Sequence, residues 1–313
     1  MLARIAHELY WIGRSLARAE HTARMLDGLF HEDVQGRRAD ASGVRLTWDS
    51  MLVIMGLELG ASSTDRDEVV RRLTLDRGNP ASVVSCVAQA REGARTVRDV
   101  FSGEMWEAIN TMQLGLVSDA SDAFRTGPYS VYAYIRERCG QFWGVTDRTM
   151  LRDDAYAFLQ AGARIEAADM TLRMLRVALP AAESATREDA EALALLQAVG
   201  GLQAYRRQVP LPPNARPVMR FLLYAREYPG SVAASVDTLL GALTSVDERA
   251  RSAAPVLRLR RLTADLEFRS RDADGERDVG ATLATVQLEL ARVDVDIADR
   301  YFGKSAAPPL HVA

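Results

Sequence analysis

The sequence predicts an all-α fold, and three observations support this prediction. Ala, Leu, Arg and Glu dominate the 313 residues and only 7% are aromatic, a bias that favours helix over sheet. Apolar residues recur every three or four positions along two long segments, as on the buried stripe of a helix. Asn79 and Pro80 are residue types preferred at a helix start. Because 48% of the residues are apolar, the chain can also bury a sizeable core.

Each helix is predicted from its apolar spacing and from the turn residues that bound it. The first has an apolar stripe from Leu2 to Phe30 and ends near Gly36. In the first half, two further helices are expected at 47–58 and 65–76. A third starts at Asn79-Pro80 and continues through residue 98. After a break at Ser102-Gly103 a fourth passes through residues 106 and 116, and a fifth runs from Gly127-Pro128 to about 149. In the second half they are expected at 153–179, 187–199, 215–226, 229–244, 246–270 and 276–302.

The apolar stripe of the first helix recurs 149 residues later. Residues 13–26 and 162–175 share six identities in fourteen positions, against the roughly one that ordinary composition would produce. The same offset relates Pro-Ala-Ser-Val at 80–83 to Pro-Gly-Ser-Val at 229–232. We therefore predict an internal duplication that folds into two related helical bundles with pseudo-two-fold symmetry. The predicted units are an N-terminal repeat at 1–150, a C-terminal repeat at 151–302 and a flexible tail at 303–313.

Composition narrows the class of protein. A net charge of −3 disfavours a nucleic-acid binder, which usually carries a basic excess. No run of about 18 apolar residues indicates a membrane span, and the N-terminus has no signal-peptide pattern. Cys86 and Cys139 lie far apart without metal-ligand spacing, as expected of free buried thiols in a reducing cytosol. We expect a cytoplasmic protein.

Several segments resemble the bacterial Alpha-E family. They are LYWIGRSLARAEHTARML at 9–26, AREGARTVR at 90–98, EMWEAIN at 104–110, FLQAG at 158–162, ADMT at 168–171 and GGLQAYRR at 200–207. The resemblance covers nearly the whole chain in order, and it implies one all-helical, cytoplasmic domain. It also implies two partners, a circularly permuted ATP-grasp ligase, which is sometimes fused to the domain, and a transglutaminase-like peptidase. Such partners imply a system that makes, modifies or trims peptide-like amide bonds.

The sequence departs from the family pattern at four positions. Ala17 stands where the resemblance expects Glu before Arg-Ala-Glu, and Ala163 and Ala167 stand where it expects arginines. Gly230 stands in place of the Arg of a Pro-Arg-Ser segment. Each departure removes a charge from an expected paired site. If that site is catalytic, this member is degenerate; if it is structural, losing both members of a pair costs less than losing one.

The first candidate site joins Glu20 and Arg24 to their repeats. The repeats are Asp169 and Arg173, and each acid precedes its arginine by four residues, which favours an ion pair within one helix. If the two pairs face each other between the long helices, they form a polar pocket in which arginine binds a peptide or amino-acid carboxylate. The candidate acid–base groups there are Glu20, Asp169 and Glu166. The alternative is a buried ion-pair network that sets helix register.

Two other arginines of the first helix, Arg14 and Arg18, point away from its apolar stripe and have no counterpart in the second copy. We expect them on the surface or facing a partner protein. Gly13 costs a helix about 1 kcal/mol relative to Ala, so it indicates a place where another helix comes close.

A second candidate binding site combines a basic stripe with an aromatic and acidic segment. Its residues are Arg91, Arg95, Arg98, Glu104, Trp106 and Glu107. It would bind an anionic ligand or a partner protein, and the alternative is a set of salt bridges between helices. The positions 149 residues after the three arginines hold Leu240, Thr244 and Asp247, so the second repeat lacks the basic stripe. Either the stripe has a function that only the first repeat performs, or the second repeat lost it by sequence drift.

The sequence lacks the usual signals of metal and nucleophile chemistry. No histidine has a Glu three residues before it, as ferritin-like metal bundles require. There is no Gly-rich phosphate loop and no G-x-S-x-G motif. We expect no metal and no cofactor, so any ligase chemistry depends on the partner.

Three functions agree with these observations. The first is an accessory or substrate-presenting subunit of a peptide ligase and peptidase system, with no activity of its own. The second is an enzyme that acts on amino acids or peptides through the Glu/Asp/Arg pocket. The third is a homo-oligomeric scaffold.

Overall fold

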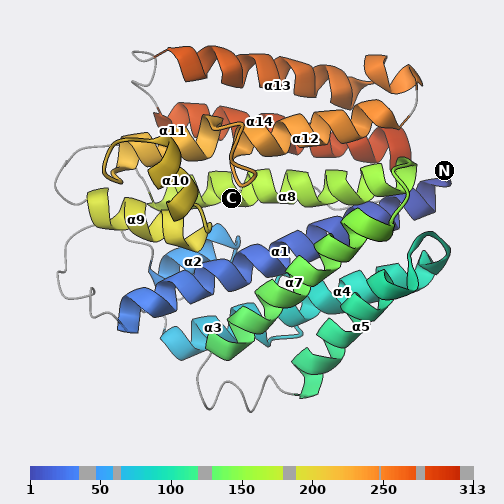
Figure 1. Ribbon diagram of the computed structural model, residues 1–313, viewed down its shortest axis with the longest axis horizontal. Helices are drawn as coiled ribbons and strands as arrows, with labels where there is room; N and C mark the ends of the chain where they lie inside the picture. Colours follow the sequence, from blue (N-terminus) through green and yellow to red (C-terminus); the bar gives the residue numbers. More distant parts are fainter. Residues whose placement is uncertain are drawn as a thin grey trace.

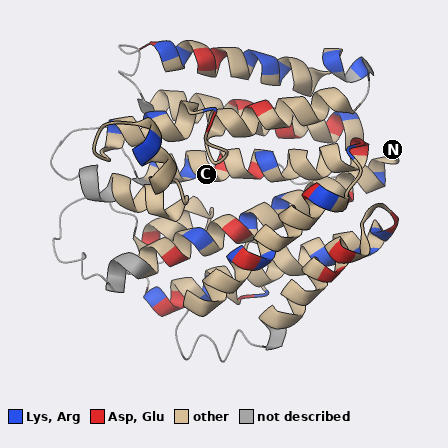
Figure 2. Ribbon diagram, viewed as in Figure 1, with Lys and Arg blue, Asp and Glu red and all other residues tan. Residues whose placement is uncertain are grey.

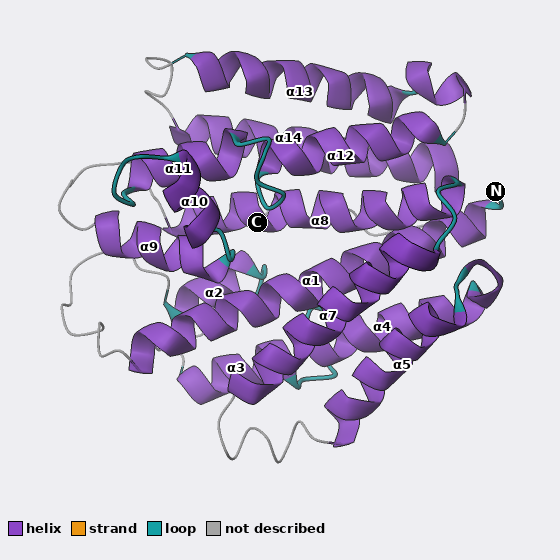
Figure 3. Cartoon of the chain, viewed as in Figure 1, coloured by secondary structure: helices purple, strands orange, loops and turns teal. Residues whose placement is uncertain are grey.

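The computed structural model describes residues 1–34, 47–58, 65–118, 129–178, 188–246, 248–272 and 279–303. Within these ranges every regular element is a helix, which confirms the all-α prediction (Figure 3). None of the helices in these ranges combines the length and the apolar character needed to cross a membrane. The predicted end of the first helix near Gly36, the break at Gly127-Pro128 and the tail beyond Gly303 lie outside the described residues.

The helices follow the predicted order closely. They are α1 (Ala3–Val34), α2 (Trp48–Ile54), α3 (Arg66–Thr74), α4 (Val83–Thr96), η1 (Arg98–Val100), α5 (Gly103–Ser118), α7 (Tyr129–Thr149), α8 (Asp154–Ala178), α9 (Glu188–Ala198), α10 (Leu202–Gln208), α11 (Ala215–Tyr224), α12 (Val232–Ser245), η2 (Glu248–Ser252), α13 (Ala254–Arg271), α14 (Val279–Ile297) and η4 (Ala298–Phe302).

Helix α4 begins later than predicted. Asn79 does not cap it, because its side-chain oxygen accepts a hydrogen bond from the Ala81 amide at 3.0 Å in a tight turn. The N-cap is Ser82, whose hydroxyl accepts from the Ser85 amide at 3.3 Å and so satisfies an N–H that has no partner within the helix. Helix α10 is an addition to the prediction, and the segment expected as one helix at 246–270 is divided into η2 and α13.

Helices α1 and α8 lie side by side at the centre of the fold and run in the same direction (Figure 1). The Met1 amino group reaches Asp154, at the start of α8, at 3.8 Å. Helix α4 packs along α1 and α12 packs along α8, with α5 and α7 on one side and α13 and α14 on the other. The predicted stripe positions Leu9, Ile12 and Leu16 are fully or almost fully buried in the hydrophobic core.

Acidic and basic residues are mixed over the helices rather than gathered on one basic face (Figure 2). Helix α13, at the edge of the molecule, carries both signs along its length. This distribution agrees with the small net charge of −3.

Gly13 and Gly162 bring the backbones of α1 and α8 into contact. A Cβ atom on Gly13 would overlap the carbonyl oxygen of Leu159, and one on Gly162 would overlap the carbonyl oxygen of Tyr10. No side chain can stand between the two helices at this crossing. The close approach that Gly13 predicts is therefore present.

Helix boundaries recur at the offset of 149 residues. Helix α4 spans Val83–Thr96 and α12 spans Val232–Ser245, so both ends coincide after the shift. Ser82 and Ser231, the residues before them, each accept a hydrogen bond from the amide three residues on. Helices α3 and α11 also start 149 residues apart.

We predict that Gly13→Ala or Gly162→Ala destabilises the protein by about 3 kcal/mol or more, because backbone atoms rather than a flexible side chain occupy the space of the added methyl group. The matched control is Gly144→Ala in α7, where no atom lies within 4 Å of the added Cβ. There alanine should stabilise the helix by up to about 1 kcal/mol. Urea denaturation measures all three, and equal effects would contradict the backbone contact.

Candidate functional site

Arg14 is buried, which corrects the prediction that it lies on the surface. Its side chain is 2% exposed, its Nε donates to Glu166 Oε2 at 3.0 Å and its Nη1 donates to Asp294 Oδ2 at 3.1 Å. The periodicity of α1 does not predict burial on this flank, but α8 packs against it and Asp294 of α14 reaches Arg14 there. Because Gly13 and Gly162 bring the two long helices into contact, the neighbouring Arg14 reaches both carboxylates.

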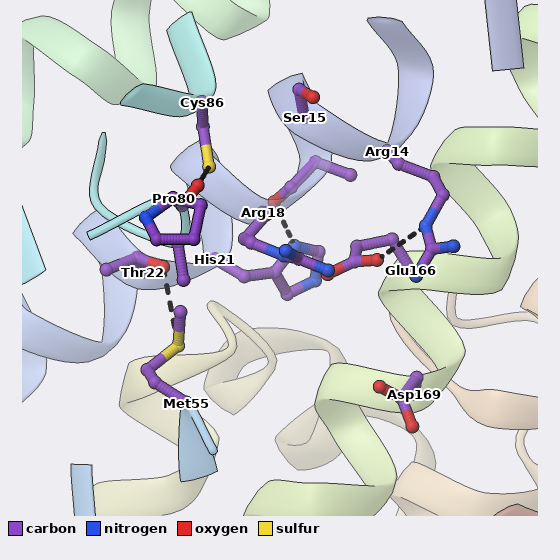
Figure 4. A network of polar contacts seen from close by, with 12 residues as sticks. Arg14, Ser15, Arg18, His21, Thr22, Met55, Pro80, Cys86, Glu166 and Asp169 are labelled. Atoms are coloured by element: carbon purple, nitrogen blue, oxygen red, sulfur yellow. Dashed lines mark hydrogen bonds and ion pairs between the residues drawn. The ribbon is translucent and has the colours of Figure 1, made fainter. Parts of the chain in front are cut away.

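Arg18 is the second arginine on Glu166, and it too is not a free surface residue. Its Nε donates to Glu166 Oε1 at 2.5 Å, while its side chain stays 26% exposed. Glu166 itself is 1% exposed and lies between the guanidinium groups of Arg14 and Arg18 (Figure 4). Both carboxylate oxygens of Glu166 are therefore held by arginine.

Tyr10 and Asp294 complete this group of side chains. The Tyr10 hydroxyl donates to Asp294 Oδ1 at 2.5 Å, and the Arg14 guanidinium carbon lies 4.6 Å from the centre of the Trp11 ring. Because Asp294 belongs to α14, the group connects α1, α8 and α14. We call these five residues the buried charge cluster: Tyr10, Arg14, Arg18, Glu166 and Asp294.

Ion pairing keeps Glu166 and Arg14 charged although both are buried. Burial opposes the charge on Glu166, but Arg18 and Arg14 outweigh it and lower the pKa of this carboxyl from 4.5 to about 2. Burial also opposes the charge on Arg14, yet Glu166 and Asp294 raise its pKa. Burial and the Asp294 charge raise the pKa of Tyr10, so it remains a neutral donor. At neutral pH, Glu166 thus has no proton to donate.

The predicted pairs Glu20–Arg24 and Asp169–Arg173 form within their own helices. Arg24 Nη2 lies 2.8 Å from Glu20 Oε1, and Arg173 Nε lies 2.7 Å from Asp169 Oδ2. The described contacts do not join the two pairs in the shared pocket that the sequence suggested. Burial raises the pKa of Asp169 although Arg173 opposes the shift, and Gln287 donates to its other oxygen at 3.1 Å.

Arg24 and Arg173 instead reach the ends of two short helices. Arg173 Nη1 donates to the Ile54 carbonyl oxygen at the end of α2 at 3.3 Å, beside Gly56. Arg24 Nη1 lies 3.2 Å from the Cβ position of Gly200, which follows α9. Both glycines have positive φ, 73° and 71°, as is common after a helix end. Each cation therefore lies where a helix C-terminus favours positive charge.

The second predicted site is a contact of α4 and η1 with α5. The guanidinium carbons of Arg91 and Arg98 lie 5.6 and 5.1 Å from the Trp106 ring centre, and Arg91 Nε donates to Asn110 Oδ1 at 2.9 Å. Arg95 instead extends into solvent and pairs with Glu92 at 3.0 Å. Glu104 and Glu107 are exposed. The structure thus brings part of this site together around one partly exposed tryptophan.

Neither cysteine has the character of a nucleophile. Burial raises the pKa of Cys86 to about 11, and burial also raises the pKa of Cys139. In the part of the chain that the structure describes, no group of His, Cys, Asp and Glu side chains could hold a metal ion.

These observations define the class of the protein. It is an all-helical protein with a buried charge cluster where its two central helices cross. Residues 1–302 match Alpha-E, described as a predicted alpha-helical domain with a conserved ER motif, so the chain belongs to the Alpha-E family. Uncharacterised proteins of Mycobacterium bovis and Mycobacterium tuberculosis are 25% identical over 323 residues. The match covers 95% of this chain but only 36% of each relative. No solved structure matches.

Three of the four departures from the expected family pattern lie at positions related to the buried charge cluster by the offset of 149 residues. Shifting Glu166, Arg14 and Arg18 by 149 residues gives Ala17, Ala163 and Ala167, and all three alanines are buried. The glutamate and two arginines belong to the buried charge cluster, and the positions related to them by the offset hold alanines. The fourth departure, Gly230, leaves space that the Tyr228 ring fills.

Sequence reasoning missed Tyr10 and Asp294 as cluster members. A signal existed for Asp294, because Val286, Leu290, Val293 and Ile297 mark the buried stripe of α14 and Asp294 lies beside it. Nothing in the sequence indicated that this stripe meets residue 14, which is 280 positions away.

We predict that Glu166→Gln destabilises the protein by about 3–5 kcal/mol, because it removes the charge that Arg14 and Arg18 share and leaves buried Arg14 with Asp294 alone. The control is Glu68→Gln, which removes an exposed partner of Arg71 and should leave the melting temperature unchanged. Thermal unfolding followed by circular dichroism measures both. A Glu166→Gln protein as stable as the control would contradict the structural role of the cluster.

The low pKa of Glu166 also predicts a pH dependence. Its folded pKa of about 2 lies below the ordinary 4.5, so its stabilising contribution is complete above pH 4.5 and is lost as pH falls towards 2. That contribution is roughly 3 kcal/mol. Urea denaturation at steps from pH 7 to pH 3 should show a shallower acid loss of stability in Glu166→Gln than in the unmodified protein. Parallel curves would contradict the assignment.

Proposed function

We propose that this chain is a helical accessory or substrate-presenting subunit of a system that makes, modifies or trims peptide-like amide bonds. It works with a circularly permuted ATP-grasp protein, which supplies the ligase chemistry, and with a transglutaminase-like protein. The proposal takes these partners from the family resemblance. The proposal that this chain is not itself catalytic rests on the buried charge cluster, in which Glu166 is shielded from solvent and held by two arginines.

The buried charge cluster favours a structural role over catalysis. A general acid or base must come within hydrogen-bond reach of its substrate and needs a pKa near the working pH. Glu166 is 1% exposed, is held by two arginines and has a pKa of about 2. Asp169 is equally enclosed, between Arg173 and Gln287. These facts weigh against the alternative of an enzyme that uses Asp169 or Glu166.

The length of the relatives supports a role beside other domains. The matched region makes up 36% of the mycobacterial proteins, so in those chains it is joined to additional sequence. A unit that works when joined to others in one chain is a reasonable partner for them when separate. Because those proteins are uncharacterised, the identity of the partner rests on the family resemblance alone.

The architecture arises, in this proposal, from duplication of a helical repeat, with halves at 1–150 and 151–302. Reciprocal contacts at the offset of 149 support it. Gly13 contacts Leu159, and Gly162 contacts Tyr10. Adding 149 to Gly13 and Tyr10 gives Gly162 and Leu159, so each contact is the counterpart of the other. Arg24 and Arg173 are likewise related by the shift, and each reaches the end of a short helix in the other half.

The duplication accounts for the ER motif in this chain. The resemblance expects Glu-Arg at 17–18 and at 166–167, and the chain keeps Arg18 from the first and Glu166 from the second. These two side chains lie 2.5 Å apart in a salt bridge. One Glu-Arg unit is thus assembled across the two halves, and its function is to hold them together.

The surface around Trp106 is our choice for partner docking. It presents Arg95 and Arg98 beside an aromatic ring, a combination enriched where proteins bind one another. At the related positions of the second half, Leu240 is half-buried and Thr244 bonds the Leu240 carbonyl within its own helix. The docking surface is therefore specific to one half.

Co-expression with an ATP-grasp protein of the same genome tests the proposal. We expect co-purification and ligase activity that depends on this chain. Arg95→Glu/Arg98→Glu should weaken the complex at least about tenfold by charge reversal. Arg260→Glu/Arg261→Glu, which reverses two exposed charges on α13, is the matched control and should bind normally. A partner that ligates at full rate and never binds this chain would overturn the proposed function.

A further inference from the structure

Helix α14 has a second apolar side, which faces solvent. The residues on it are Leu288, Ala291, Val295 and Ala298, spaced by three and four positions along α14 and the start of η4. We call these four residues the outer stripe. Leu288 and Val295 are 44% and 45% exposed, whereas Leu290, on the opposite side of the helix, is fully buried. A surface helix of a monomer normally has one apolar side, so the outer stripe is suited to a contact with another molecule.

Helix α7 is the equivalent helix in the first half of the chain. It packs against α1 and α5, as α14 packs against α8 and α13 (Figure 1). Its outer side carries Glu137, Gln141, Gly144 and Arg148, which are all exposed. Along the described length of α7, no large apolar side chain after Tyr129 is exposed. The exposed apolar stripe is thus a property of α14 and not of this position in the fold.

The inner side of α14 is fixed by its neighbours. Asp294 accepts a hydrogen bond from Arg14 Nη1 of α1 at 3.1 Å, and Asp296 accepts one from Arg258 Nε of α13 at 2.7 Å. Because two other helices hold α14, the outer stripe is presented in one conformation. Binding to such a face costs less ordering entropy than binding to a mobile segment.

Two opposite charges lie along one edge of the outer stripe. Arg292 and Asp299 are both exposed and are separated by about two helical turns. Arg292 pairs with Glu289 within α14 at 2.6 Å, and among the described residues Asp299 has no ion-pair partner. An edge with one basic and one acidic residue at this spacing is complementary to a second copy of itself that runs in the opposite direction.

An antiparallel pair of α14 helices related by a two-fold axis would satisfy these charges. With the axis between Val295 and Asp296, Arg292 of each copy lies opposite Asp299 of the other, because the two residues are equally far from the axis. Val295 then lies beside its own copy, and Leu288 faces the end of η4 of the second copy. A parallel pair would instead oppose like charges, which is unfavourable.

We infer that this chain forms a two-fold homodimer through the outer stripe of α14, with antiparallel helices and two ion pairs between Arg292 and Asp299. The small side chains of Ala291 and Ala298 let the helix axes approach to about 8 Å. One helix pair buries less area than a standard interface, so the dimer is weak and reversible. It does not require the ATP-grasp protein and forms in the purified chain.

Sedimentation velocity on the full chain, from about 1 to 200 µM, should show a monomer that becomes a dimer as concentration rises. Val295→Glu should weaken dimerisation at least about tenfold, because it places two like charges at the axis. The matched control is Leu257→Glu, which changes a 52% exposed side chain on α13 and should dimerise normally. A chain that is still monomeric at about 200 µM, or an equal loss in both variants, would overturn the inference.

Reversal of the edge charges tests the antiparallel arrangement. Arg292→Asp and Asp299→Arg should each weaken the dimer at least about tenfold, because each places like charges opposite one another. The double variant exchanges the two charges and should return to within about threefold of the unmodified chain. Arg260→Asp, at an exposed arginine of α13, is the control and should have no effect. A double variant as weak as the single variants would contradict the Arg292–Asp299 pairing.

Disulfide trapping locates the axis. Both native cysteines are buried, so a single exposed cysteine can be followed without interference. Val295→Cys should form a disulfide-linked dimer under mild oxidation, because the residue lies beside its own copy. In Leu288→Cys the two thiols are about 20 Å apart in an antiparallel pair, so this control should not link. Equal linking of both variants would indicate a parallel or non-specific contact and would overturn the inference.

Discussion

The ion pair between Arg14 and Glu166 is the interaction on which the rest of the structure depends. Two charges removed from water are tolerated only if their partners are placed well, because burial opposes ionisation. Placement here depends on Gly13 and Gly162, which bring the helix backbones into contact. Asp294 then adds α14 to the pair. The register of three helices is thus held by charges that are shielded from water and paired with one another.

The same enclosure limits what the centre of the protein can do. A carboxylate held by two arginines and shielded from solvent stabilises a fold well, but it cannot exchange protons with a substrate near neutral pH. The surfaces that other molecules can reach lie elsewhere, around Trp106 on α5, on the outer stripe of α14 and in a pocket between α10 and α11. This arrangement supports the proposed role of a subunit that presents or positions a substrate rather than transforming it.

Under the proposed duplication, the energetics of buried charge explain why alanines stand together at 17, 163 and 167. If only the glutamate of a second set were lost, two arginines would stay buried without an anion. Such an unpaired buried charge strongly lowers the free energy of unfolding. Losing the glutamate and both arginines leaves small apolar side chains, which pack without a desolvation cost. One cluster is enough to hold the crossing, because the two glycines and the surrounding apolar core also define it.

The sequence by itself determined the helices, the buried stripe through Leu9, Ile12 and Leu16 and the close approach at Gly13, because these depend on spacing and backbone freedom within one segment. It also indicated the local pairs of Glu20 with Arg24 and Asp169 with Arg173, which need only four residues of helix. Only the tertiary structure decided that Arg14 is buried and that its partners are Glu166 and Asp294. Helical periodicity describes one helix and its own stripe, whereas the burial of a flank depends on which other helices cover it, and these lie 152 and 280 residues away along the chain.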